Sequence, residues 1–284
     1  MATVKIKVGL FLVALSWFSY TLYRFALSIT GQIVSFTDVP GTIGLGFRSA
    51  GSFIAVVVIL FYLVKRDLSA PEVIMSLRWI VAFEAIYFFC FLQSAIWGLA
   101  TVFPGYPREL LIVSTGLPCL AEALVIPLVL TKLFLELNPK KAASGATKWA
   151  LIAGTTYLFV FWFNYTMQWI AALMDTGVRF VLYPINAFGF ALTAVGLLGV
   201  AFYAALSFRR TLGSEKLTGL GLRKIGVIVT AVGLYFDLML LLYLLFGSVG
   251  GYNMWHTFFV YHNVDLWCLA FPVAGLPLLF QPQR

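Results

Sequence analysis

Charged residues are scarce in this chain of 284 residues, in which Asp, Glu, Lys and Arg together make up 11%. Hydrophobic residues make up 62%, and the mean hydropathy is +0.97. A soluble protein of this size needs a polar shell around its core, and the chain has too few polar residues to build one. The composition therefore excludes a soluble globular protein and predicts an integral membrane protein surrounded by the lipid bilayer.

The sequence also lacks the motifs of the common cofactor and catalytic sites. Cys90, Cys119 and Cys268 are odd in number and form no C-x-x-C pair, which excludes a disulfide framework or a structural zinc site. The two histidines, His256 and His262, are six residues apart and face different sides of one helix, which argues against a haem held by both. Walker, Rossmann and G-x-S-x-G signatures are missing, so no cofactor or metal is indicated and we do not expect an enzyme.

Long apolar runs recur from one end of the sequence to the other. They are solid rather than alternating, which excludes a transmembrane barrel, and each has about the length of a helix that crosses a bilayer. The sequence thus predicts an all-α, polytopic membrane helical bundle in one domain, residues 1–284. About eight spans are expected, at 8–29, 47–64, 76–99, 110–135, 149–172, 180–206, 224–246 and 257–279.

Positive charges collect in every second gap between these runs. Fifteen of the 19 Lys and Arg residues fall on the N-terminal side of the predicted membrane, and the other side has only Arg24, Arg48, Arg108 and Arg179. Basic loops remain in the cytoplasm, so both termini are predicted to be cytoplasmic in a plasma membrane protein. The net charge of +8 is divided among short loops and forms no stripe for nucleic acid.

A faint internal symmetry relates the two halves of the chain. The fourth run contains Cys119-Leu120-Ala121 and the eighth contains Cys268-Leu269-Ala270, each followed by a proline within ten residues of the cysteine. The third and fourth spans of each half carry one carboxylate apiece: Glu84 and Glu122, then Asp237 and Asp265. A parallel repeat of four plus four spans is one interpretation, and chance similarity between apolar segments is the other.

These four carboxylates are the strongest candidates for function, because ionisable groups inside a bilayer are costly. Asp237 and Asp265 are predicted at similar depth in adjacent helices, and His262 shares a helix face with Asp265. Together they would form a proton or cation site, from which Glu84 and Glu122 continue a relay toward the cytoplasm. A single His–carboxylate pair does not define a metal site.

Other polar side chains are predicted in the outer half of the membrane. They suggest a pocket open to the outside, and the alternative is that each one joins neighbouring helices by a hydrogen bond. The residues are His256, Gln93, Asn164, Gln168 and Asn186. A glycine-rich segment, 41–51, is expected to form a tight outer turn followed by close helix packing.

Two functional hypotheses follow. The first is a proton- or cation-linked transporter or channel that uses the intramembrane carboxylates. The alternative is a non-catalytic membrane subunit of a larger energy-transducing or redox complex, since the chain has no complete cofactor motif and is rich in aromatic residues that can pack against other helices. A ligand-sensing receptor ranks lower, because the short loops leave little surface for a signalling partner.

Overall fold

The computed structural model describes residues 2–30, 39–64, 70–102, 104, 107–138, 143–174 and 184–212, together with 227, 228, 230, 231 and 234. This part of the chain is helical and contains no strand. Asp237, His256, His262 and Asp265 lie outside the described residues, as do the predicted span 257–279 and most of 224–246.

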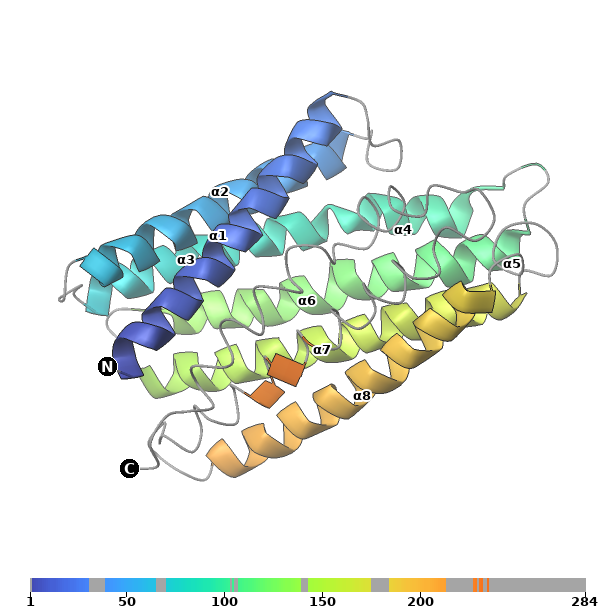
Figure 1. Cartoon of the computed structure of the whole chain (residues 1–284). Helices are drawn as coiled ribbons and strands as arrows, with labels where there is room; N and C mark the ends of the chain where they lie inside the picture. The colour runs from blue at the N-terminus through green and yellow to red at the C-terminus, as the bar shows by residue number, and fades with distance from the viewer. Residues whose placement is uncertain are drawn as a thin grey trace.

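The helices follow one another with short connections. In chain order they are α1 (Ala2–Ile29), α2 (Val39–Val64), α3 (Ala70–Phe89), α4 (Phe91–Ala100), α5 (Arg108–Leu111), the π-helical turn η2 (Ile112–Gly116), α6 (Leu117–Glu136), α7 (Ala143–Met174) and α8 (Pro184–Leu212). Helices α1, α2, α3, α6, α7 and α8 each pack against the next in this order. Figure 1 shows them lying lengthwise beside one another as a bundle.

Four helical segments are long and apolar enough to cross a membrane: Val8–Ile29, Val39–Phe61, Glu72–Ala100 and Arg108–Glu136. They overlap the first four predicted spans, and helices α7 and α8 overlap the fifth and sixth predicted spans. The all-helical class and the apolar helices of membrane length are therefore confirmed.

Two of the four segments are interrupted. Cys90 separates α3 from α4, and its N–H donates to both Ile86 O and Tyr87 O at 3.1 Å. The fourth segment contains the π-helical turn, and Pro127 lies inside its helix α6. Such irregular turns are tolerated in a membrane only where neighbouring groups satisfy the freed backbone atoms.

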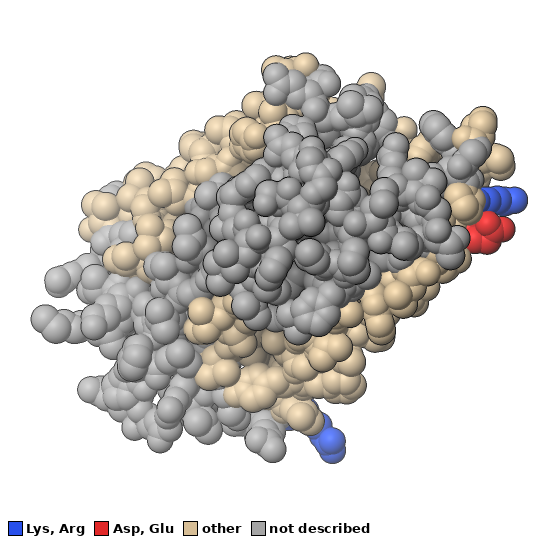
Figure 2. Space-filling view, turned by 45° about the vertical axis from the view of Figure 1, so that its right-hand side comes forward, with Lys and Arg blue, Asp and Glu red and all other residues tan. Residues whose placement is uncertain are grey.

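Large apolar side chains cover the outside of the bundle. Trp79 is 53% exposed, Phe202 56% and Leu128 69%, which suits contact with lipid. On the face shown in Figure 2, the described charged side chains lie at the extremities of the molecule and the described flank between them is uncharged. The core, by contrast, joins four helices through Leu45 of α2, Tyr87 and Phe88 of α3, Ile126 of α6 and Val160 of α7.

The glycine-rich segment of α2 lies in a helix and not in a turn, which corrects the prediction. Helix α2 begins at Val39, eight residues before the predicted start at 47, with Pro40 in its first turn, a position that proline favours. The predicted close packing is found: a Cβ on Gly44 would lie 3.0 Å from the Cβ of Cys90, and one on Gly46 would lie 3.2 Å from the ring of Phe25. The glycines therefore bring α2 against α1 and α3.

Candidate functional site at the centre of the bundle

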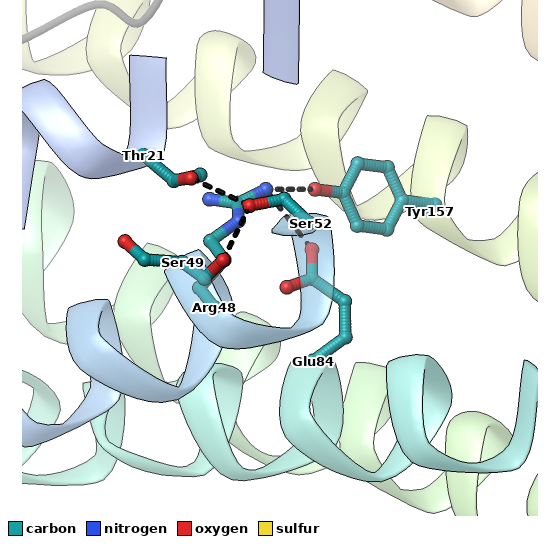
Figure 3. A network of polar contacts seen from close by, with 6 residues as sticks. All are labelled: Thr21, Arg48, Ser49, Ser52, Glu84 and Tyr157. Atoms are coloured by element: carbon teal, nitrogen blue, oxygen red, sulfur yellow. Dashed lines mark hydrogen bonds and ion pairs between the residues drawn. The ribbon is translucent and has the colours of Figure 1, made fainter. Parts of the chain in front are cut away.

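An arginine and a glutamate form an ion pair inside the bundle. Arg48 of α2 approaches Glu84 of α3, with 3.1 Å between Nη2 and Oε1, and the two side chains are 7% and 15% exposed. Buried charges of this kind are stable only when they are paired and hydrogen-bonded. Figure 3 shows the hydroxyl of Tyr157 and the carboxylate of Glu84 both facing Nη2 of the Arg48 guanidinium.

Aromatic side chains enclose the guanidinium of Arg48. Its central carbon lies 4.2 Å from the ring centroid of Tyr87 and 5.6 Å from that of Phe88. Nη2 also donates to the hydroxyl of Tyr157 on α7 at 3.4 Å. A guanidinium is planar and weakly hydrated, so it can stack on aromatic faces while its edge makes hydrogen bonds. Arg48 thus connects α2 to α3 and α7.

A row of small polar residues joins α1 to α2 beside this ion pair. The hydroxyls of Thr21 and Ser52 are 2.8 Å apart and buried, and Ser52 also donates to Ser49 O at 2.9 Å. Arg24 of α1 is only 3% exposed. Tyr87 lies close enough to both Arg24 and Arg48 for their charges to act on it.

A second buried carboxylate lies across the core on α6. Glu122 is 5% exposed, and its Oε1 accepts a hydrogen bond from Asn164 Nδ2 of α7 at 2.6 Å. Arg48 and Glu122 are close enough to interact electrostatically. Within the described residues, the buried centre thus holds two arginines and two glutamates, which balance in formal charge.

The centre lies at mid-height in the bundle. Glu122 is 14 residues from Arg108 and 14 from Glu136, the two ends of its helical segment, or about 21 Å from each at 1.5 Å per residue. Glu84 is 14 residues from Ala70 and 16 from Ala100. Glu84 is therefore also close to the middle of the segment that α3 and α4 form together.

A further polar contact joins α7 to a backbone carbonyl of the π-helical turn. Pro118 has no N–H, so it cannot donate to the carbonyl of Ser114 four residues earlier. The side-chain amide of Gln168 on α7 donates to Ser114 O instead. Gln168 is thereby tied to a helix, and of the two interpretations of this residue the structure favours the hydrogen bond between helices.

The structure brings together only part of the predicted site. Glu84, Glu122 and Asn164 belong to the buried centre, whereas Gln93 of α4 is exposed on the bundle surface. Asn186 belongs to α8, and its side chain is outside the described residues, as are Asp237, His256, His262 and Asp265. The carboxylate relay and the outer pocket therefore stay predictions for these residues.

Two buried arginines lie where the sequence did not predict them. Arg24 and Arg48 were counted as outer basic residues, but they are buried at 3% and 6% exposure. For Arg48 the reason is that the predicted span begins at residue 47, whereas Asp38 followed by Val39-Pro40 is a typical helix start that places Arg48 well within the helix. As a result, the sequence did not predict the buried Arg48–Glu84 pair.

No family model, curated protein or solved structure matches this chain. Among the residues that the structure describes, no group of three or more His, Cys, Asp or Glu side chains is placed to hold a metal ion.

Proposed function

We propose that the protein is a proton-linked transporter whose substrate and proton pass through the buried charged centre. The observation that carries the proposal is the set of ionisable groups at mid-height: the Arg48–Glu84 pair, and Glu122 held by Asn164. Charges at this depth cost several kcal/mol and in membrane proteins mark ion pathways and proton relays. Hydrogen bonds alone would hold helices together at lower cost, as Thr21 and Ser52 do.

The two glutamates have different surroundings, which supports different roles. Glu84 is in direct contact with the cation of Arg48, whereas Glu122 accepts a hydrogen bond from the neutral amide of Asn164. A carboxylate beside an amide can gain and lose a proton without leaving an arginine unpaired. Glu122 is therefore the proposed proton carrier, and the Arg48–Glu84 pair is the proposed fixed element beside it.

The proposal includes the second half of the chain. Asp237, Asp265 and His262 would continue the proton or cation path toward the outside, with His256 near its mouth. Eight spans, cytoplasmic termini and a plasma membrane location are retained as part of the proposal. Because Arg24 and Arg48 are buried, the outer loops keep two basic residues against fifteen on the cytoplasmic side, which strengthens the predicted orientation.

Proton flux in proteoliposomes tests this proposal. The purified full-length protein is reconstituted with a trapped pH-sensitive dye, and a potassium diffusion potential is imposed. We expect proton entry above that of protein-free vesicles, and at least a tenfold loss in Glu122→Gln and in Asp265→Asn. Glu109→Gln is the matched control, because Glu109 is an exposed carboxylate on the same helical segment.

The complex-subunit interpretation predicts a different result. If wild-type flux equals that of empty vesicles, and mild-detergent purification from the native membrane yields a stoichiometric partner protein, the transporter proposal is wrong. A lone protein whose flux depends on Glu122 supports it.

A further inference from the structure

The Arg48–Glu84 ion pair uses only half of its bonding capacity. A guanidinium and a carboxylate can form two parallel bonds, but here Nη2–Oε1 at 3.1 Å is the one that is made. Arg48 Nε and Glu84 Oε2 are both buried, and neither has a hydrogen-bond partner in the part of the chain that the structure describes. We call Arg48 Nε and Glu84 Oε2 the open edge of the pair.

An unsatisfied polar atom at this depth needs an explanation. Leaving a buried donor or acceptor without a partner destabilises the folded protein, and it does so more strongly for a charged group. Native proteins have few such atoms, and each calls for an explanation, of which a bound water or ion is one. Here a donor and an acceptor occur together in one ion pair at mid-height.

The surroundings restrict how a molecule can reach these atoms. One face of the guanidinium is stacked against Tyr87 at 4.2 Å, and Nη2 is already engaged by Glu84 and Tyr157. The Nε–H bond lies in the plane of the guanidinium, so a ligand that accepts a hydrogen bond from it must lie near that plane, at the edge of the pair.

The charge of the pair defines the chemistry of that ligand. Arg48 and Glu84 neutralise each other, and a bound ion would place a net charge at the middle of the membrane. A neutral molecule avoids this cost. It must offer an acceptor to Arg48 Nε–H beside a donor to Glu84 Oε2, which is the arrangement of the C=O and N–H groups of a primary amide or urea.

We propose that the open edge of the Arg48–Glu84 pair binds a small neutral amide or urea-type solute. This deepens the proposed function, on which it rests for the transport of that solute, while the binding step stands by itself. Glycerol has a similar size but has hydroxyl groups and no planar amide edge, so it should bind much more weakly.

Binding and transport are tested separately. Equilibrium binding of radiolabelled acetamide to the purified full-length protein in detergent is measured against competing urea and glycerol. Uptake of acetamide into proteoliposomes is then measured with and without an inward proton gradient. We expect urea to compete at least tenfold better than glycerol, and the gradient to increase uptake.

The decisive variant is Arg48→Lys. It keeps the positive charge beside Glu84 but removes the Nε–H edge, so acetamide binding should fall about tenfold or more. Glu84→Asp, which withdraws the acceptor, is a second variant in case the lysine protein does not fold. Ser49→Ala is the control, because its buried hydroxyl points away from Glu84 in Figure 3 and its loss should leave binding unchanged.

The outcomes separate the two proposals. Acetamide binding that is lost in Arg48→Lys supports the inference even if no proton flux is found. Proton flux that depends on Glu122, without measurable acetamide binding, overturns the inference and leaves the transporter proposal standing. Equal competition by urea and glycerol also overturns it, because water or any hydroxyl compound would then serve at the open edge.

Discussion

Glu122 Oε1 and Asn164 Nδ2 lie 2.6 Å apart at mid-height in the bundle, which joins α6 to α7 through a carboxylate and a neutral amide. The glutamate is 5% exposed, so this amide takes the place of hydration for a group that would otherwise lack it. The contact has consequences for stability whatever the function of the protein.

Replacing Asn164 with Leu should destabilise the protein. The substitution leaves the buried carboxylate of Glu122 without its amide donor, and contacts of this kind in membrane proteins contribute about 1 kcal/mol. The free energy of unfolding is measured by titrating SDS into mixed micelles. In a Glu122→Leu background the same substitution should cost less, and an equal cost in both backgrounds would show that the two residues are not coupled.

The Arg48–Glu84 pair should show strong coupling in a double-mutant cycle. Arg48→Met and Glu84→Met each leave one uncompensated buried charge, which costs about 3–5 kcal/mol. The double variant removes both charges and should lose less than the sum of the single losses. Unfolding in SDS is again the measurement, and strictly additive losses would contradict a direct ion pair.

Gly98→Ala should disrupt the contact between α4 and the π-helical turn. A Cβ at Gly98 would lie 2.6 Å from the backbone nitrogen of Gly116 and 2.9 Å from its Cα. Because these are backbone atoms, the two helices must separate, at a cost of about 1–3 kcal/mol.

Gly154→Ala is the matched control for this prediction. A Cβ at Gly154 of α7 would meet nothing within 4 Å, so alanine should leave stability unchanged or raise it by about 0.5–1 kcal/mol through its higher helix propensity. Thermal unfolding of both variants in the same detergent gives the comparison. Equal stability of Gly98→Ala and the wild-type protein would mean that the helices are not in backbone contact.

The helices could be predicted from the sequence, and the partners inside the bundle could not. Apolar runs of bilayer length depend on local composition, so six predicted spans overlap helices, although their ends differ by up to eight residues. The pairing of Arg48 with Glu84 depends on which helix faces meet, and a single sequence contains no signal for that. Glu84 and Glu122 were recognised because a carboxylate in an apolar run is costly wherever it points.

Arg24 and Arg48 were missed for a related reason. An arginine near the end of an apolar run is usually a topology signal at the membrane surface. It lies inside the bundle instead when the helix extends beyond the apolar run. Helix α2 extends eight residues further toward its N-terminus than its hydropathy indicated, because the glycines of 41–51 allow close packing while lowering the apparent hydrophobicity. Packing between helices therefore overrode the local signal at this position.

Gln168 and Pro118 should be coupled although their side chains need not touch. Gln168→Leu removes the amide that donates to Ser114 O, a carbonyl that has no α-helical donor because residue 118 is proline. Inside a bilayer no water is present to replace this donor, so the loss of the hydrogen bond to Ser114 O should lower the free energy of unfolding by about 1–3 kcal/mol.

The variant Pro118→Ala tests this explanation, because it restores an N–H four residues after Ser114. In that background the cost of Gln168→Leu should fall by at least half, as measured by SDS unfolding of all four proteins. A cost that is the same with proline and with alanine would show that Gln168 acts through packing and not through the carbonyl of Ser114.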